Sequence, residues 1–254
     1  MPNDAALTVT DLVVRFGGVT ALDGVSCTVR TGEVCGLIGP NGAGKTTLFD
    51  CVSRLTRPRS GRIEVAGRDL LALPAHRVAR LGVSRTFQHL GLVPSLSVRD
   101  NVMLGAQHGS RTGFPAAALR VGVRSQEREL RRRADAVLDR LGLAPLAGHP
   151  AAGLPYGTLK RVELARALAA EPALLMLDEP ASGLSHGEVD ELAELIEDVR
   201  AGMTVLLVEH HMGMVMRLSD TVVVLDFGKV VATGPPAAVQ EDPAVLAAYL
   251  GTPA

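Results

Sequence analysis

The order of apolar and polar residues predicts strands at the start of the chain. Residues 7–16 and 21–30 alternate between apolar and polar side chains, as half-buried antiparallel strands do. A continuous apolar run at 32–39 predicts a fully buried strand, and a glycine-rich break separates it from a helix expected over 45–55. The first part of the chain is therefore expected to form an antiparallel β-subdomain that leads into a buried strand.

Less regular elements follow before the pattern changes. A strand is expected at 62–67, a short helix at 73–82 with Gly82 as its stop, and strand-like character at 83–88. From about 95 to 170 the periodicity becomes helical.

The clearest helix of this middle part covers 125–143. One face of it carries the apolar residues Leu130, Ala134, Val137, Leu138 and Leu141. Just before it, 108–124 is rich in glycine and small residues and is expected to be a loop with a short helix.

After Pro172 apolar strands and helices alternate again. The expected elements are a strand at 173–178, a helix at 186–201, a strand at 204–209, a helix at 211–218, two strands within 220–234 and a helix at 242–251 capped by Asp242. Such alternation is typical of a largely parallel sheet covered by helices on both faces. The fold class is therefore α/β.

Composition narrows the classes of function. The chain has 26 basic and 27 acidic residues, whereas nucleic-acid proteins are usually strongly basic. No apolar run approaches the roughly 18 residues of a membrane helix, and the first residues lack the pattern of a secretory signal. Three cysteines without metal-ligand spacing indicate reduced thiols in the cytoplasm.

The break after the buried strand carries the clearest chemistry. The stretch GPNGAGKTT fits the phosphate-loop pattern G-x-x-x-x-G-K-[ST] and lies between a strand and a helix, where backbone N–H groups can surround a phosphate. Lys45 is expected to reach the β and γ phosphates, and the Thr46 hydroxyl to bind Mg²⁺. The predicted nucleotide-binding residues of this loop are Gly39, Pro40, Asn41, Gly42, Ala43, Gly44, Lys45, Thr46 and Thr47.

Two carboxylates stand where such a loop needs them. Asp178 ends the apolar strand LLMLD, and ligands bind at that end of strands in open α/β sheets. Mg²⁺ takes one or two carboxylates and keeps much of its water, so Asp178 is a candidate ligand. Glu179 follows directly and can accept a proton from an attacking water.

With these motifs in order, the chain resembles the ATP-binding-cassette (ABC) ATPases over nearly all of its length. The resemblance implies that Phe16 stacks on adenine. It further implies that Gln88 is a catalytic residue and a ligand of Mg²⁺, and that it links the core to a helical subdomain. It also implies that His210 senses the γ-phosphate and that Ala181–Ser185 contacts a partner subunit.

The resemblance also explains the stretch LPYGT at 154–158, which occupies the place of the family signature L-S-G-G-Q. In that family the signature closes over the ATP of a second subunit, which assigns Tyr156 and Gly157 to a nucleotide bound in trans. Pro155, Tyr156 and Thr158 depart from the usual signature, and the tyrosine form is known among importers of branched-chain amino acids and related solutes. Two further departures are Ser185, where aspartate or asparagine is usual, and His211, where aspartate often follows the sensor histidine.

The resemblance implies one ABC ATPase domain over 1–254. Its P-loop core has a mixed sheet flanked by helices, with the core at about 1–94 and 171–254 and an inserted helical subdomain at about 95–170.

The implied function is ATP hydrolysis in an importer, with ATP and Mg²⁺ as cofactors. The implied partners are a second ATPase subunit, identical or related, multi-spanning permease subunits and indirectly an external solute-binding protein. The chain would be peripheral at the cytoplasmic face of the membrane, without nucleic acid. Alternatives are a soluble mechanical ABC ATPase of repair or the ribosome, and the ATPase of a lipid or lipopolysaccharide exporter. A lone P-loop GTPase or kinase is disfavoured because it would leave the LPYGT stretch unexplained and because no N-K-x-D motif is present.

Overall fold

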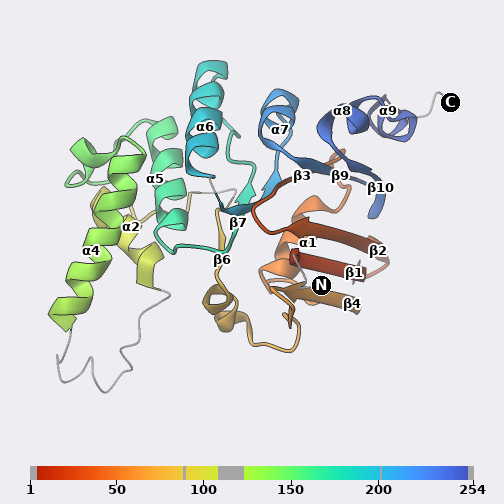
Figure 1. Ribbon diagram of the computed structural model, residues 1–254, viewed down its shortest axis with the longest axis horizontal. Coiled ribbons are helices and arrows are strands. Elements are labelled where there is room, and N and C mark those ends of the chain that lie inside the picture. The colour runs from red at the N-terminus through yellow and green to blue at the C-terminus, as the bar shows by residue number, and fades with distance from the viewer. Residues whose placement is uncertain (1–4, 88–89, 108–122, 201, 251–254) are drawn as a thin grey trace. The chain divides into compact units, whose positions relative to one another are not determined.

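The computed structural model describes residues 5–87, 90–107, 123–200 and 202–250 (Figure 1). The chain divides into two compact units, one formed by Met1–Arg85 with Ala173–Ala254 and the other by Thr86–Pro172. The helical segment predicted at about 95–170 lies within the second unit. Among the described helices, none is long and apolar enough to cross a membrane.

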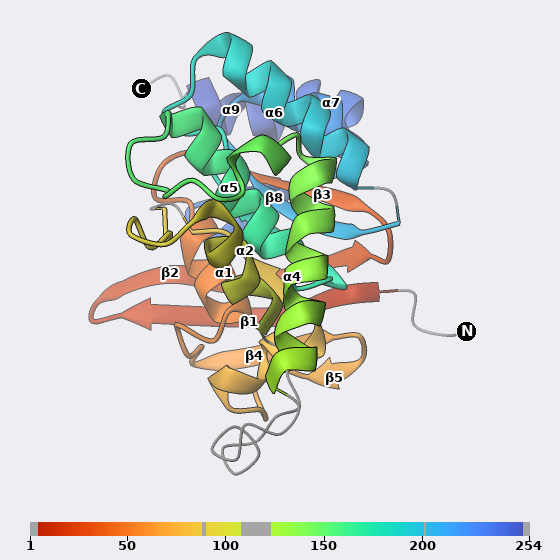
Figure 2. The same ribbon diagram turned by 90° about the vertical axis from the view of Figure 1, so that its left-hand side faces the viewer.

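The first unit contains an antiparallel sheet of four strands in the order β2-β1-β4-β5. Its strands are β1 (Ala5–Phe16), β2 (Val19–Arg30), β4 (Ser60–Val65) and β5 (Arg68–Asp69). Figure 2 shows β1, β2 and β4 side by side. The antiparallel pairing of β1 with β2 confirms the prediction made from their alternating pattern.

The second sheet of this unit has six strands in the order β10-β9-β3-β8-β7-β6. They are β3 (Val34–Ile38), β6 (Val83–Arg85), β7 (Leu174–Asp178), β8 (Thr204–Val208), β9 (Thr221–Asp226) and β10 (Lys229–Gly234). All neighbours pair in parallel except β9 with β10. The carboxyl ends of β3, β8 and β7 therefore meet at one edge of the sheet, where the motifs follow.

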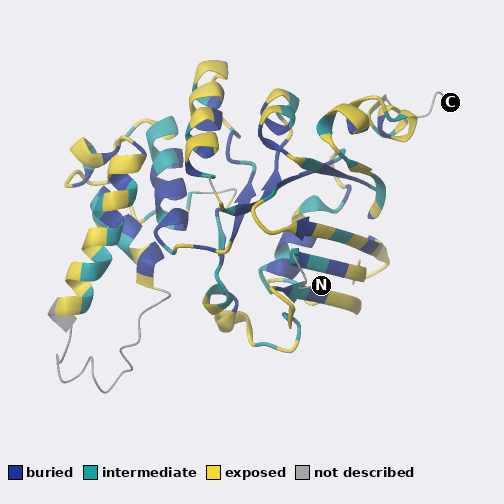
Figure 3. Ribbon diagram, viewed as in Figure 1, coloured by how far each residue is buried: buried dark blue, intermediate teal, exposed yellow. Residues whose placement is uncertain are grey.

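Two apolar clusters hold the first unit together. The larger joins the antiparallel sheet, the second sheet and helix α1 (Lys45–Val52), whose Phe49 is fully buried. The smaller lies on the other face, where Ile38 packs with α7 (Met212–Leu218), α8 (Pro236–Gln240) and α9 (Pro243–Leu250). Figure 3 shows the central strands buried on both faces, which explains their uninterrupted apolar sequence.

The second unit is helical. It contains α2 (Val98–Ala106), α4 (Val123–Arg140) and α5 (Tyr156–Leu168). A Cβ at Gly105 would lie 1.9 Å from the carbonyl oxygen of Arg166, so α2 and α5 approach each other closely only because this residue is glycine.

Several predicted elements differ from the structure in length or type. The segment 73–82 forms two 3₁₀ turns, Ala75–Arg77 and Ala79–Leu81, although Gly82 does end it in a left-handed conformation. The helix expected over 45–55 ends at Val52 because Arg54 has a φ of 61°. Helix α8 was not predicted. Asp242 caps α9 as expected, since its Oδ1 accepts from the Ala244 N–H at 2.8 Å.

Candidate functional site

The phosphate loop needs glycine at both of its ends. Gly39 has a φ of 147°, and a Cβ there would lie 2.0 Å from the Leu225 carbonyl oxygen. Gly44 has a φ of 105°, and its Cβ would lie 2.6 Å from the Ala21 carbonyl oxygen. Both glycines let the backbone turn tightly into the N-terminus of α1, whose N–H groups and dipole favour an anion.

Lys45 opens α1 and folds back over the loop. Its Nζ donates to the carbonyl oxygens of Gly39 at 2.6 Å and Pro40 at 2.9 Å. Burial lowers the pKa of the amine, and the nearby charge of Glu179 opposes that shift. Because an ammonium group has three donors, it can also bind a phosphate at this place. Thr46 follows in the first turn with an exposed side chain.

The two predicted carboxylates lie at the end of β7. Asp178 is only 4% exposed, and its burial raises the pKa of the carboxyl group, against the hydrogen bond and charge of Arg85. Glu179 leaves the strand with a φ of 45°, and its N–H donates to the Val208 carbonyl oxygen at 2.9 Å. A left-handed non-glycine residue costs about 1–3 kcal/mol and often marks a functional site.

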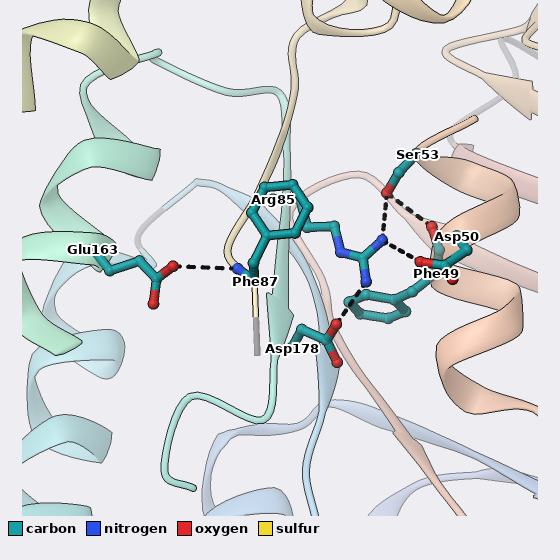
Figure 4. A network of polar contacts seen from close by, with 7 residues as sticks. All are labelled: Phe49, Asp50, Ser53, Arg85, Phe87, Glu163 and Asp178. Carbon is teal, nitrogen blue, oxygen red and sulfur yellow. Dashed lines mark hydrogen bonds and ion pairs between the residues drawn. The ribbon is translucent and has the colours of Figure 1, made fainter. Parts of the chain in front are cut away.

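Arg85 is a residue that the sequence pattern did not single out. It ends β6 beside β7, and its Nη2 donates to Asp178 Oδ2 at 2.6 Å (Figure 4). An arginine within the strand-like segment 83–88 was the available sign.

Glu209 is the second such residue, and it is 1% exposed at the end of β8. Its Oε2 accepts from the N–H groups of His210 and His211 at 2.8 and 3.0 Å. Its Oε1 accepts from the Ala181 N–H at 2.7 Å, so this one carboxylate joins the loops after β7 and β8. The imidazole of His210 stays more than half exposed, where it can reach a ligand.

Phe16 ends β1 and is 54% exposed. It pairs with Val19 across a tight hairpin, and Ala21 of the same hairpin touches the phosphate loop at Gly44. The ring is thus on the surface rather than in the core, on a hairpin that borders the loop.

The LPYGT stretch begins α5 in the second unit. Pro155 precedes the helix in an extended conformation, and Tyr156 is 43% exposed. The N–H groups of the first helical residues have no acceptor within the helix, so those of Tyr156, Gly157 and Thr158 can bind an anion. Lys160 is buried, and its Nζ lies 5.6 Å from the centre of the Tyr156 ring.

Two other predicted positions have different outcomes. Gln88 lies outside the described residues. Phe87 is the last residue described before it, and Leu90 is the first described after it. Within the second unit, the Phe87 N–H donates to the buried carboxylate of Glu163 at 3.4 Å (Figure 4).

Ser185 caps α6 (His186–Val199), since its N–H and Oγ both donate to Glu188 Oε2. Serine is therefore well suited to that position.

All three cysteines are free thiols. Burial raises the pKa of Cys27 and of Cys51 to about 12 and also raises that of Cys35. Since the thiolate is the reactive form, these side chains are packing residues rather than nucleophiles.

The residues at this edge of the sheet suit ATP and Mg²⁺. The glycines form a backbone cradle that a Cβ would block, and Lys45 supplies a cation beside it. Within the described part of the chain, no cluster of three histidine, cysteine or acidic residues could hold a metal alone. Thr46 and Asp178 suit Mg²⁺ because this ion completes its shell with phosphate oxygens and water.

Comparison with known proteins gives matches over nearly the whole chain. Residues 22–182 match the ABC transporter family, and residues 229–254 match the C-terminal family described as branched-chain amino acid ATP-binding cassette transporter. The chain is 41% identical to the high-affinity branched-chain amino acid transport ATP-binding protein LivG of Salmonella typhimurium, covering 96% of this chain and 97% of that one. It is 40% identical to BraF of Pseudomonas aeruginosa with the same coverage.

Solved structures show the same fold. A nucleotide-free ATP-binding cassette from an ABC transporter aligns with a TM-score of 0.84 at 28% identity, over 98% of this chain and 100% of that one. The ADP conformation of an ATP-binding cassette aligns with the same score and identity, over 98% and 99%.

Proposed function

The chain belongs to the ABC transporter family, and from this premise we propose that it is the ATP-hydrolysing subunit of an importer for branched-chain amino acids or related small polar solutes. The observation that carries the proposal is similarity to LivG and BraF over nearly the whole chain, together with the matching C-terminal segment. The same similarity favours an importer over a repair or ribosomal ATPase and over a lipid exporter.

ATP binding is assigned to the phosphate loop and the hairpin beside it. Lys45 and the backbone N–H groups of the loop hold the β and γ phosphates, and Phe16 stacks on adenine. The exposed ring and the border between its hairpin and Gly44 support this assignment.

Thr46, Asp178 and Gln88 would hold Mg²⁺, which when bound neutralises charge on the phosphate oxygens. Thr46 has an exposed side chain at the start of α1, and Asp178 ends the strand beside β8. Hydroxyl, carboxylate and amide oxygens are the ligands that this ion prefers.

Hydrolysis is assigned to Glu179, and supporting roles are assigned to His210 and Gln88. Glu179 accepts a proton as water oxygen bonds to the γ-phosphorus and the bond to ADP breaks. His210, held through its backbone by Glu209, contacts the γ-phosphate. Catalysis then depends mainly on positioning and on stabilisation of charge.

A second ATPase subunit completes the site. Tyr156 and Gly157 would face the ATP bound by the partner subunit, so ATP bridges two subunits and hydrolysis removes the bridge. Affinity purification from native membranes distinguishes a second copy of this chain from a related chain as the partner.

The chain would work at the cytoplasmic face of the membrane, bound to permease subunits that receive solute from an external binding protein. The surface proposed for the permease follows Gln88 in the second unit, where Val93 is 39% exposed and Leu92 is partly exposed. Exposed apolar side chains gathered in one segment are typical of an interaction surface.

Affinity purification of this chain from native membranes tests the proposal. We expect multi-spanning permease subunits and an ABC ATPase partner in the purified complex, and ATP hydrolysis that responds to a leucine-loaded binding protein. Recovery of the chain without membrane subunits, with hydrolysis indifferent to a membrane fraction, would favour the mechanical ATPase.

A further inference from the structure

Arg85 forms a buried polar network that links two parts of the catalytic unit (Figure 4). Its side chain is only 9% exposed. Nη1 donates to Asp50 Oδ1 at 2.7 Å and to Ser53 Oγ at 3.0 Å, and Nη2 donates to Asp178 Oδ2 at 2.6 Å. The guanidinium carbon also lies 5.4 Å from the centre of the Phe49 ring.

The partners of Arg85 come from two different elements. Phe49, Asp50 and Ser53 belong to α1 or follow its last turn, and α1 begins at the phosphate-loop lysine. Asp178 is the last residue of β7. The guanidinium therefore connects the helix that follows the phosphate loop to the carboxylate at the strand end.

Burying an arginine side chain carries a desolvation penalty. Removing its charge from water costs several kcal/mol, and an apolar side chain of similar volume often stabilises a fold as well or better. The planar fork of arginine can bind two carboxylates in fixed directions, which lysine cannot. This suggests that the orientation of the carboxylates, more than stability, is what the network provides.

Building on the proposed function, we propose that Arg85 is a positioning residue for the magnesium-binding carboxylate Asp178. A carboxylate has about four lone-pair sites, so one carboxylate can both accept a hydrogen bond and bind a cation. By holding Asp178 against α1, Arg85 keeps that carboxylate in place relative to Thr46 and the phosphate loop. Residues that orient metal ligands typically change metal affinity about 10- to 100-fold when mutated.

The test measures binding of a fluorescent ATP analogue, mant-ATP, in Mg²⁺ and in EDTA. For Arg85→Met we expect affinity in EDTA close to that of the wild type and a loss of about 10-fold or more in the gain that Mg²⁺ gives. Arg85→Lys keeps the charge and one partner, so it should retain part of this gain. Asp50→Asn removes one anchor on α1 and should lower it less than Arg85→Met does.

Arg200→Met is the matched control, because Arg200 pairs with Asp220 at the opposite end of the strands, where the Asp220 N–H donates to the Val34 carbonyl oxygen. It should leave the Mg²⁺ gain unchanged. Thermal unfolding without nucleotide establishes that each variant is folded, and if Arg85→Met is not, Arg85→Lys and Asp50→Asn carry the test.

The outcomes separate this proposal from the proposed function. An unchanged Mg²⁺ gain in the Arg85 and Asp50 variants would mean that the network serves only the fold. An increased gain would mean that Arg85 competes with the cation, which also overturns the proposal. If wild-type protein shows no Mg²⁺ gain at all, the magnesium assignment itself fails together with the role of Arg85.

Discussion

At the scale of single residues, the proposed ATP hydrolysis depends most on Glu179. Its strained φ and its place directly after Asp178 put a carboxylate where the chain leaves the sheet. A general base contributes about 10²- to 10⁴-fold to a rate, so Glu179→Gln should lower steady-state ATP turnover by at least about 100-fold. ATP affinity should remain, because the amide preserves the shape. Glu194→Gln, at an exposed position on α6, is the control. Near-normal turnover in Glu179→Gln would contradict the assignment.

Replacement of Lys45 should affect ATP binding, whereas replacement of Glu179 should affect turnover. Its Nζ is the cation of the phosphate loop, and hydrogen bonds to charged groups contribute about 1.5–3 kcal/mol. Lys45→Ala should therefore weaken ATP binding itself by roughly 10- to 150-fold, measured by titration of the isolated chain. Lys229→Ala, which removes only a surface ion pair to Asp23, should leave the affinity unchanged. Unchanged affinity in Lys45→Ala would remove the role stated for this lysine.

The Gly39→Ala variant tests whether the backbone at Gly39 leaves no space for a Cβ. An alanine there would place its Cβ 2.0 Å from the Leu225 carbonyl oxygen, whereas one at Gly42 meets nothing within 4 Å. Overpacking costs about 1–3 kcal/mol, so Gly39→Ala should lower the free energy of unfolding by more than Gly42→Ala, where only the φ of 82° adds strain. Urea unfolding without nucleotide measures both. Equal losses would show that the loop is not restricted at Gly39.

At the scale of elements, α5 carries the prediction about the second subunit. Gly157 lies at the start of the helix, where a negative side chain would repel the phosphate of a nucleotide bound in trans. Gly157→Asp should therefore lower hydrolysis while ATP affinity of the isolated chain stays the same. Gly148→Asp, at a position with open space, is the control. An equal loss of affinity and hydrolysis would indicate local misfolding or a role in cis.

Much of the element pattern could be predicted from the sequence. The central strands are apolar throughout because both faces are buried, and the phosphate loop is marked by glycines that the backbone requires. The 3₁₀ turns at 73–82 were predicted as a helix because short apolar periodicity does not distinguish the two.

Arg85 and Glu209 show where prediction from sequence stops. Each is a single charged residue at the end of a strand, and each has a partner far away in the sequence: Asp178 for Arg85 and Ala181 for Glu209. Local pattern gives no direction for such a side chain. The tertiary fold decides that both are buried and that both reach the same edge of the sheet.

At the scale of the whole molecule, the proposed role of this chain is to drive transport through other subunits by hydrolysing ATP. Within the described residues, no helix is long and apolar enough to cross a membrane. The proposed function assigns the path for the solute to permease subunits. Similarity to LivG and BraF extends over nearly the whole chain and includes its C-terminal segment, which makes branched-chain amino acids the first solutes to test.

The most direct measurement is uptake of labelled leucine into proteoliposomes that contain the complex purified through this chain, with ATP inside and the external binding protein added. We predict uptake with the wild-type chain and its loss with Glu179→Gln at equal assembly of the complex. Leucine uptake that is the same with Glu179→Gln, or ATP hydrolysis that does not respond to leucine and its binding protein, would contradict the account.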